Sequence, residues 1–316
     1  MKPEVLVLAA LQSPDVMAQL DQQFTCHHVW RQPQAARAGF IAGVAPGVRA
    51  VVTTAAIGVN TALLDQLPAL EMVAVNGIGL DAIPLDATRA RGLVVSNTPD
   101  VLTDDVADLA LALLLAAARR LPALDRYVRA GDWEAGVALA PARALRGKVC
   151  GIYGYGRIGQ AVAKRAQAFG LQVQYFQPRA IDAVATPRAD SLLALAQASD
   201  YLVVAAPATP ATRHAINAEV MAALGPQGTL VNIARGALVD EEALVAALRD
   251  GALGMAALDV FADEPRVPAA LRALDNAVLT PHVGSLTVET RHAMGQLVVD
   301  NLLAHFAGQA LPTPVK

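Results

Sequence analysis

Short apolar segments alternate with helical segments along almost the whole chain, and this alternation constrains the fold more than any other feature. Residues 48–54, 72–76 and 93–97 are examples, each rich in Val and ending at polar or turn-forming residues. Such segments are typical of strands that are buried on both faces of a sheet. Strands that alternate with helices predict parallel sheets covered by helices, so the expected fold class is α/β.

The alternating segments form two series, which suits a chain of 316 residues, the length of about two ordinary domains. The first series ends near residue 97, and the second runs from residue 148 to residue 279. Between them, residues 106–118 are apolar around most of a helix, and the three residues before them offer oxygens for its N-cap. We expect this helix to be central and buried, and a long helix over residues 285–307 to close the chain.

The composition excludes several classes of protein. Hydrophobic residues make up 54% of the chain and charged residues 17%, so the chain is not disordered as a whole. The 25 basic residues are outnumbered by 28 acidic residues, which leaves no basic excess for binding nucleic acid. The most apolar run, residues 109–118, is too short for a bilayer, which needs roughly 20 residues. We therefore expect no nucleic-acid partner and no membrane partner.

Two features indicate a reducing compartment. Cys26 and Cys150 form neither a disulfide framework nor a metal-binding motif, so we expect inert thiols and no metal. The apolar run at the N-terminus is short and has no convincing cleavage site, which predicts a first strand rather than a signal peptide. The expected location is the cytoplasm.

A glycine motif opens the second series. It follows the predicted strand at residues 148–153, opens the predicted helix at residues 157–169, and reads Gly154-Tyr155-Gly156-Arg157-Ile158-Gly159. In this context Gly154 permits a tight turn, Gly156 lets the backbone approach a pyrophosphate, and Gly159 lets the helix pack on its strand. The helix N-terminus then offers N–H groups to the phosphates. The motif predicts a dinucleotide cofactor.

The end of the next strand indicates which dinucleotide is preferred. NAD enzymes place Asp or Glu there to bind the ribose 2′-hydroxyl, but this chain has Gln177 followed by Pro178 and Arg179. Arg179 could pair with a 2′-phosphate, and Arg157 could contribute a second cation. The alternative is that Arg179 is an ordinary surface charge. We expect NADPH or NADP as the preferred cofactor, with NADH or NAD also possible.

Six motifs in the same order resemble those of the D-isomer-specific 2-hydroxyacid dehydrogenases, above all the hydroxyphenylpyruvate, hydroxypyruvate and glyoxylate reductases. The resemblance covers essentially the whole chain. It implies a Rossmann cofactor domain over residues 98–284, inserted into a flavodoxin-like substrate domain made of residues 1–97 and 285–316. Besides the glycine motif, the stretches that carry it are residues 76–81, 97–103, 232–236, 258–265 and 280–285.

Three polar residues follow three predicted strands of the second series and are expected at one sheet edge, where ligands of α/β proteins gather. They are Arg235, Glu264 and His282. A guanidinium can hold a carboxylate and polarise a ketone, and an imidazole can donate a proton near neutrality. The resemblance assigns the proton donor to His282, its carboxylate partner to Glu264 and the substrate cation to Arg235. A structural ion pair is the alternative for Arg235 and Glu264.

The resemblance also implies subsidiary roles. Ile78 and Gly79 would present backbone N–H groups to the substrate carboxylate, together with Arg235 and His282, and Asp259 would accept a hydrogen bond from the nicotinamide carboxamide. A plain turn is the alternative for Ile78 and Gly79, and a loop hydrogen bond is the alternative for Asp259. The remaining residues expected beside the cofactor are Thr103, Pro207, Thr212, Ile233, Ala234 and Gly284.

The sequence therefore predicts an NADP-preferring reductase that converts a small-molecule 2-oxo acid to the D-2-hydroxy acid. Family dimers exchange the segment around Trp133, so a homodimer is expected. Two other enzymes of the scaffold fit less well, because formate dehydrogenases carry Gln at the position of Glu264 and phosphoglycerate dehydrogenases normally prefer an acidic residue at that of Gln177. A cofactor-sensing corepressor on the same scaffold is a further alternative, which the three polar residues alone do not exclude.

Overall fold

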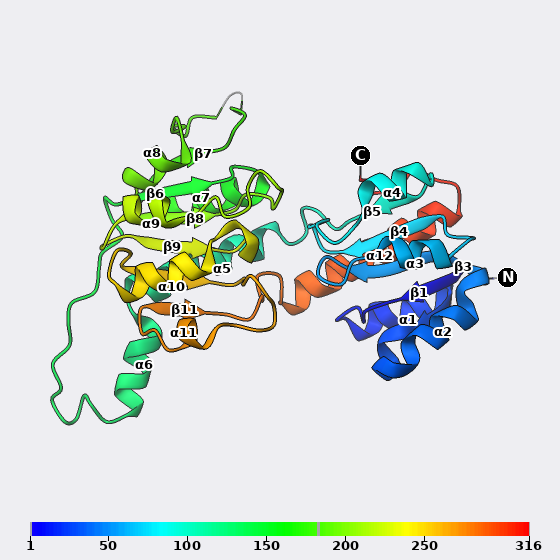
Figure 1. Ribbon diagram of the computed structural model, residues 1–316, viewed down its shortest axis with the longest axis horizontal. Coiled ribbons are helices and arrows are strands. Elements are labelled where there is room, and N and C mark those ends of the chain that lie inside the picture. The colour runs from blue at the N-terminus through cyan, green and yellow to red at the C-terminus, as the bar shows by residue number, and fades with distance from the viewer. Residues whose placement is uncertain (1, 182–183, 316) are drawn as a thin grey trace. The chain divides into compact units, whose positions relative to one another are not determined.

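The computed structural model describes residues 2–181 and 184–315 and divides the chain into two compact units. Unit 1 consists of Met1–Leu102 and Ser285–Lys316, and unit 2 is Thr103–Gly284 (Figure 1). The expected second boundary, between residues 284 and 285, coincides with this division. The expected first boundary, between residues 97 and 98, lies before it, because Thr98 exchanges hydrogen bonds with Gly77 of unit 1.

Unit 1 contains a five-stranded sheet in the order β2-β1-β3-β4-β5, and all its strand pairs are parallel. This is the flavodoxin-like order, in which the chain leaves β1 in one direction and returns on the other side at β3. The prediction of a flavodoxin-like domain is confirmed. The strands are β1 (Glu4–Val7), β2 (Thr25–His28), β3 (Val48–Thr54), β4 (Met72–Asn76) and β5 (Val94–Ser96).

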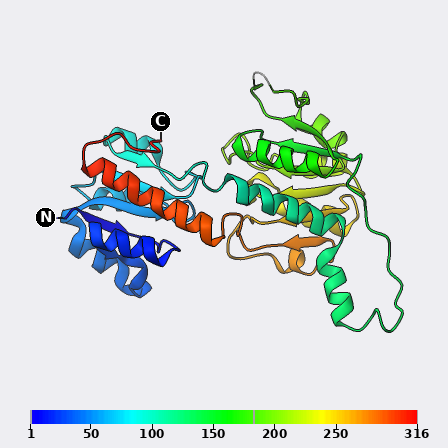
Figure 2. The ribbon, with the colours of Figure 1, turned by 180° about the vertical axis from the view of Figure 1, so that it is seen from behind.

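Helices cover both faces of the unit 1 sheet, as expected for strands that are apolar on both sides. One face is covered by α1 (Pro14–Gln23) and α12 (Val288–Phe306), whose side chains share one core cluster (Figure 2). The other face carries α2 (Arg37–Val44), α3 (Thr61–Gln66) and α4 (Leu85–Ala90) around a second core cluster.

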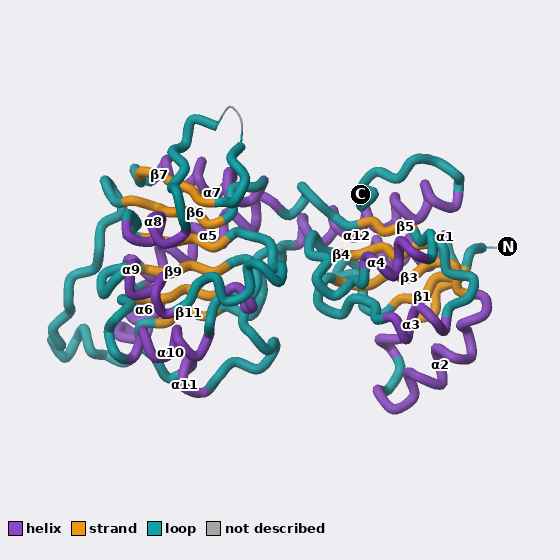
Figure 3. Tube along the Cα trace, turned by 45° about the horizontal axis from the view of Figure 1, so that its top comes forward, coloured by secondary structure: helices purple, strands orange, loops and turns teal. Residues whose placement is uncertain are grey.

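Unit 2 contains a six-stranded, fully parallel sheet in the order β11-β10-β9-β8-β6-β7 (Figure 3). The topological switch point lies between β6 and β8, and β6 is the strand that leads into the glycine motif. Beyond β7, a single parallel bridge joins Tyr175 to Arg188. The strands are β6 (Val149–Tyr153), β7 (Gln172–Phe176), β8 (Tyr201–Val204), β9 (Thr229–Asn232), β10 (Met255–Leu258) and β11 (Ala277–Leu279).

The helices of unit 2 also lie on both faces of its sheet (Figures 1 and 2). The predicted apolar helix is α5 (Thr103–Ala118), and it is buried inside unit 2 against α7 (Arg157–Ala168) and the sheet. Its apolar circumference is thus explained by packing within one unit. The opposite face carries α8 (Leu192–Gln197), α9 (Ala218–Leu224) and α10 (Glu241–Arg249), and the short α11 (Ala269–Arg272) precedes β11.

An arm extends from the body of unit 2 and consists of α6 (Leu121–Arg129) and the loop that returns to β6 (Figure 1). The arm carries no core of its own, since none of the α6 residues is buried. Its large apolar side chains are exposed, and they include Leu121, Val128, Trp133, Val137 and Leu139. No helix within the described residues has the length and apolar character needed to cross a membrane.

Candidate active site

Three neighbouring parallel strands of unit 2 bring the predicted polar residues to one edge of the sheet. Leu258 of β10 is in register with Asn232 of β9 on one side and with Leu279 of β11 on the other. The strands therefore end together, and Arg235, Glu264 and His282 follow them within a few residues. This is the carboxyl edge, where ligands of open α/β sheets bind.

His282 and Glu264 form a close pair at this edge. The His282 Nδ1 lies 2.7 Å from Glu264 Oε2, and Glu264 Oε1 accepts the backbone N–H of Phe261 at 3.0 Å. Burial alone would raise the pKa of Glu264, but the hydrogen bonds from His282 and Phe261 and the charge of Arg235 outweigh it. The net effect lowers the pKa of Glu264, so its carboxylate is charged at neutral pH. The charge of Arg235 contributes to this effect because its side chain is close to the pair.

A tight backbone approach holds Arg235 beside the pair. Gly236 has no room for a side chain, because a Cβ atom would overlap the backbone of Phe261. Asn232 fixes the same turn, accepting the Ala234 N–H at 3.0 Å and donating to the Arg235 carbonyl at 2.9 Å. The turn after β9 therefore lies directly against the loop after β10. The sequence analysis gave Asn232 no role, although it stands in one of the family motifs.

The loop that carries His282 is anchored by a buried carboxylate. Asp259 is 1% exposed and accepts the Thr280 hydroxyl at 2.7 Å and the N–H groups of Val283 and Gly284, both at 2.9 Å. His282 has a left-handed backbone with φ of 54°, a strained conformation of the kind found at functional sites. The loop hydrogen bonds that were the alternative reading of Asp259 are thus present. Three of the roughly four acceptor sites of a carboxylate are used, which leaves one for a ligand.

The glycine motif has the geometry that a dinucleotide requires. Gly154 has φ of 91°, and a Cβ atom there would lie 2.5 Å from the backbone of Ala206. Gly159 packs on the Gly154 carbonyl with no room for a side chain, whereas the space around Gly156 is open. Gly156 is the N-cap of α7, and Gln160 donates the first hydrogen bond of that helix, to the Gly156 carbonyl. The earlier N–H groups, including that of Ile158, have no partner inside the helix and fit a pyrophosphate.

Gln177 connects the glycine motif to the end of β7. Its side-chain oxygen accepts the Tyr155 N–H at 3.0 Å, and its amide donates to the Arg179 carbonyl at 2.7 Å. The Arg179 side chain is exposed and makes no hydrogen bond or ion pair with another described residue. Arg188 adds a second guanidinium, which binds the carbonyls of Gln177 and Pro178. The sequence analysis missed Arg188 because it lies in an irregular segment without a motif.

Several other predicted residues shape loops near the strand ends of unit 2. Thr212 holds the turn after β8, because its hydroxyl donates to the Pro207 carbonyl at 2.8 Å. The Thr103 hydroxyl at the start of α5 is buried, with no partner among the described residues. Ile233 is buried at the end of β9, and Ala234 follows it in the turn.

Unit 1 places Ile78 and Gly79 just after β4, at the carboxyl edge of its own sheet. The Asn97 side chain donates to the Ile78 carbonyl at 3.0 Å, and the Thr98 hydroxyl accepts the Gly77 N–H at 3.0 Å. The N–H groups of Ile78 and Gly79 donate to no residue that the structure describes. Two adjacent free N–H groups form a site that can bind an anion.

The side chains of both cysteines and of four histidines lie outside this site. Burial raises the pKa of both thiols to about 12, which agrees with the expectation that they are inert. Four histidines outside the site each pair with a carboxylate in unit 1, as His27–Glu4, His28–Asp21, His292–Asp15 and His305–Glu71.

Comparison with known protein families decides what this arrangement is. The model of the D-isomer specific 2-hydroxyacid dehydrogenase NAD binding domain matches residues 111–284, which is more than half of the chain. The chain belongs to the D-isomer specific 2-hydroxyacid dehydrogenase family. It is therefore an NAD(P)-dependent oxidoreductase that interconverts 2-oxo acids and 2-hydroxy acids, and the predicted family, fold class and enzyme class are confirmed.

The relatives of the dehydrogenase cover almost its full length. It is 50% identical to a hydroxyphenylpyruvate reductase of Plectranthus scutellarioides, over 94% of each chain. The solved structure of a 2-hydroxyacid dehydrogenase from Ketogulonicigenium vulgare has a TM-score of 0.92, with 43% identity, and the match covers 100% of this chain and 99% of that one. An NADPH-dependent glyoxylate/hydroxypyruvate reductase from Sinorhizobium meliloti, solved with NADP and malonate, has a TM-score of 0.89, with 39% identity and coverage of 100% and 97%.

Proposed function

We propose that the dehydrogenase works as a reductase of small 2-oxo acids of the glyoxylate, hydroxypyruvate or hydroxyphenylpyruvate type, and that it forms the D-2-hydroxy acids. The observation that carries the proposal is the His282–Glu264 pair at 2.7 Å, with the charge of Arg235 beside it. The relatives named as reductases of these acids support it. They do not favour the corepressor alternative.

The reaction adds a hydride to the carbonyl carbon and a proton to the carbonyl oxygen. When bound, the nicotinamide cofactor supplies the hydride. His282 donates the proton, and Glu264 orients the imidazole and favours its charged form. Arg235 holds the substrate carboxylate and stabilises the charge that develops on the carbonyl oxygen. In unit 1 the N–H groups of Ile78 and Gly79, which donate to no described residue, are proposed to bind a carboxylate.

Apart from Thr103 at the start of α5, the residues proposed to hold the cofactor follow the strands of unit 2. Gly154, Gly156 and Gly159 cradle the pyrophosphate, with Ile158 and Arg157 at the first turn of α7. The remaining acceptor site of Asp259 receives the carboxamide of the nicotinamide. The other proposed cofactor contacts are Thr103, Gln177, Pro178, Arg179, Pro207, Thr212, Ile233, Ala234 and Gly284.

NADPH is the proposed preferred cofactor, because the ribose would meet the Gln177 amide and the Arg179 guanidinium, which has no partner among the described residues. We expect kcat/KM to be higher with NADPH than with NADH by at least about tenfold. One charge-assisted contact contributes ~1.4 kcal/mol, and this energy corresponds to a tenfold ratio. Gln177→Asp should move the preference toward NADH by adding an acceptor for the 2′-hydroxyl and repelling a 2′-phosphate. Initial rates with both cofactors measure this, and equal values for the native enzyme would contradict it.

The dehydrogenase is further proposed to act as a homodimer in a reducing cytoplasm. The arm supports the dimer because Trp133, which is 72% exposed, and its apolar neighbours enter no core formed by the described residues. A dimer that covers the arm should bury more than the ~2,000 Å² at the lower end of obligate interfaces. The two free thiols, of half-buried Cys26 and buried Cys150, suit a reducing compartment.

The experiment that tests the proposed activity is a substrate panel. NADPH oxidation is followed with glyoxylate, hydroxypyruvate and hydroxyphenylpyruvate, and the chirality of the product is determined. The proposal predicts turnover of at least one of these acids to the D-isomer. Tight NADPH binding without turnover of any of them would favour the corepressor alternative instead.

A further inference from the structure

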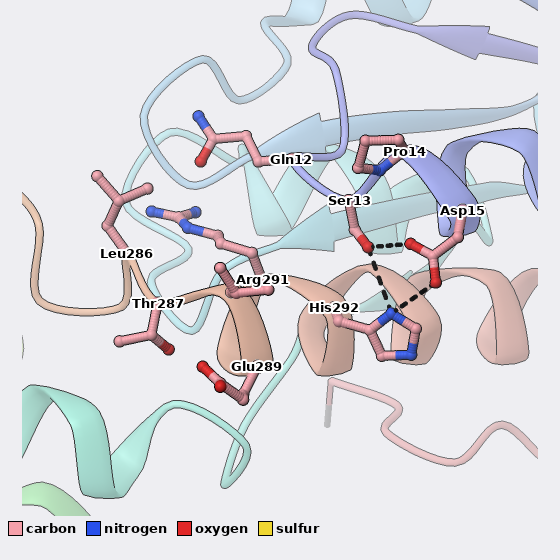
Figure 4. A pocket seen from close by; sticks show the side chains of 10 residues that line it. Gln12, Ser13, Pro14, Asp15, Leu286, Thr287, Glu289, Arg291 and His292 are labelled. Carbon is pink, nitrogen blue, oxygen red and sulfur yellow. Dashed lines mark hydrogen bonds and ion pairs between the residues drawn. The ribbon is translucent and has the colours of Figure 1, made fainter.

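Unit 1 contains a cavity of about 760 Å³ between the loop after β1 and the first two turns of α12 (Figure 4). Its lining includes Gln12 and Pro14 from the loop side, and Leu286 and Arg291 from the other side. The order β2-β1-β3 makes the carboxyl end of β1 the topological switch point of this sheet. Switch points are where open α/β sheets bind ligands, so the cavity lies at a place suited to binding.

Arg291 is the unusual residue of this cavity. Its Nε is fully buried without a hydrogen-bond partner, and its guanidinium makes no ion pair with another described residue. Burial lowers the pKa of Arg291, and no opposite charge offsets that effect. The part-buried Arg165 differs, because it is paired with Asp104 and Asp108. A half-buried charge without a partner among the described residues is destabilising, so this guanidinium at a cavity points to an anionic ligand.

The acidic groups of the cavity do not supply the missing partner. Asp15 accepts the Ser13 hydroxyl at 2.5 Å and pairs with His292 at 3.0 Å. Figure 4 shows the Arg291 side chain directed toward Gln12, whereas the Glu289 carboxylate points away from it. The single positive charge of Arg291 is thus left facing the cavity beside the Gln12 amide.

The apolar residues that line the cavity indicate which group the ligand carries besides its negative charge. Leu286 is 49% exposed and Pro14 lies across the cavity from the start of α12, so both can contact an apolar group. One cation matches one negative charge, and apolar walls match a carbon skeleton. A carboxylate carried on a small apolar body meets both conditions better than inorganic phosphate does.

We propose that this cavity is a second anion site, which binds a small organic carboxylate through Arg291 and Gln12 with its apolar body against Leu286 and Pro14. Arg291 would hold the carboxylate with charge-assisted hydrogen bonds, and the Gln12 amide would donate another. The residues are separate from Arg235, Glu264 and His282, and the proposal does not depend on the reductase activity.

Calorimetric titration with 4-hydroxyphenylacetate, which has no ketone to reduce, tests the site. The titration uses Arg235→Gln, so that binding at the proposed catalytic site is weakened. Adding Arg291→Gln should weaken the remaining binding at least about tenfold, the ratio that ~1.4 kcal/mol represents, and Arg291→Lys should retain part of it. Arg37→Gln is the matched control and should change nothing, because Arg37 is an exposed arginine of unit 1 that donates to the Gln32 backbone carbonyl at 3.2 Å.

If Arg291→Gln leaves the binding of 4-hydroxyphenylacetate unchanged, the second anion site is wrong. That result would not contradict the proposed reductase activity. If inorganic phosphate binds more tightly than 4-hydroxyphenylacetate and this binding is lost when Arg291 is replaced, the assignment to a carboxylate is wrong.

Thermal unfolding separates a binding role of Arg291 from a structural one. Without ligand, Arg291→Met should keep or raise the Tm, because it removes a half-buried charge that has no partner among the described residues, and it should abolish the rise in Tm caused by 4-hydroxyphenylacetate. A lower Tm, or a variant that does not fold, would show a structural role and contradict the proposal.

Discussion

The two units of the dehydrogenase share one architecture but use the carboxyl edges of their sheets differently. In unit 2 the edge is a network of side chains. Asp259 anchors the loop that carries His282, and the Glu264 carboxylate is hydrogen-bonded to the His282 imidazole. In unit 1 the edge offers backbone N–H groups at Ile78 and Gly79, and a cavity with an unpaired Arg291. The comparison teaches that a parallel α/β sheet supplies only the platform, and that the loops after its strands supply the chemistry.

The difference predicts where substitutions act most strongly. A side-chain network loses its chemistry when one member is removed, whereas a backbone site survives most side-chain changes around it. Substitutions at the edge of unit 2 should therefore reduce turnover, and those at the edge of unit 1 should mainly change the affinity for substrate.

Replacing His282 with Ala removes the proposed proton donor. We expect turnover to fall roughly 10²–10⁴-fold at every pH where the native enzyme is active, the range typical for loss of a general acid. NADPH binding, followed by fluorescence, should be preserved, because the phosphate contacts lie at the glycine motif. Near-normal turnover in this variant would refute the role of His282.

Replacing Gly236 with Ala tests the close approach of the two loops in unit 2. The new Cβ would overlap the backbone of Phe261, so we expect a loss of about 1–3 kcal/mol in the free energy of unfolding and lower turnover. Gly39→Ala in α2 of unit 1 is the control, since nothing lies within 4 Å of its Cβ, and it should be neutral or stabilising. Urea unfolding of both variants measures the difference, and equal stabilities would contradict the account.

Replacing Thr98 with Val tests the backbone site of unit 1. The change removes the hydroxyl that accepts the Gly77 N–H at 3.0 Å and should cost about 1 kcal/mol, a typical hydrogen bond. Because this hydrogen bond holds the turn that carries Ile78 and Gly79, we expect KM for the 2-oxo acid to rise, by at most about the fivefold that ~1 kcal/mol represents, with kcat little changed. Steady-state kinetics separates the two constants. A fall in kcat with unchanged KM would break the contrast between the two edges.

The sequence predicted the elements with strong apolar patterns and missed those without them. The strands at residues 48–54 and 72–76 and the one that precedes the glycine motif are found within a residue of their predicted ends. The edge strand β2 was missed because Thr25–His28 is polar and its histidines pair with carboxylates rather than enter a core. Helix α6 was missed because it lies on the exposed arm, where no burial shapes its sequence.

The site could be predicted as far as motifs reach. The resemblance indicated Arg235, Glu264 and His282, and their strands do bring them to one edge. Contacts that depend on the folded loops could not be predicted, such as the hydrogen bond that the Asn232 side chain donates to the Arg235 carbonyl. Arg291 was also missed, because an arginine in the first turns of a helix looks like an ordinary surface charge until its burial is known.

The most direct test of the proposed acid–base pair, in which His282 donates the proton of reduction and Glu264 is its hydrogen-bond partner, is the pH–rate profile of Glu264→Gln. Hydrogen bonds and the nearby Arg235 lower the pKa of Glu264, so the native carboxylate remains charged across the neutral range. Reduction requires a protonated imidazole, and its rate should fall as the pH rises. Without the Glu264 charge this fall should move to lower pH, so that activity is lost at neutral pH and better preserved at acid pH, with NADPH binding unchanged. A profile identical in position to that of the native enzyme would contradict the account.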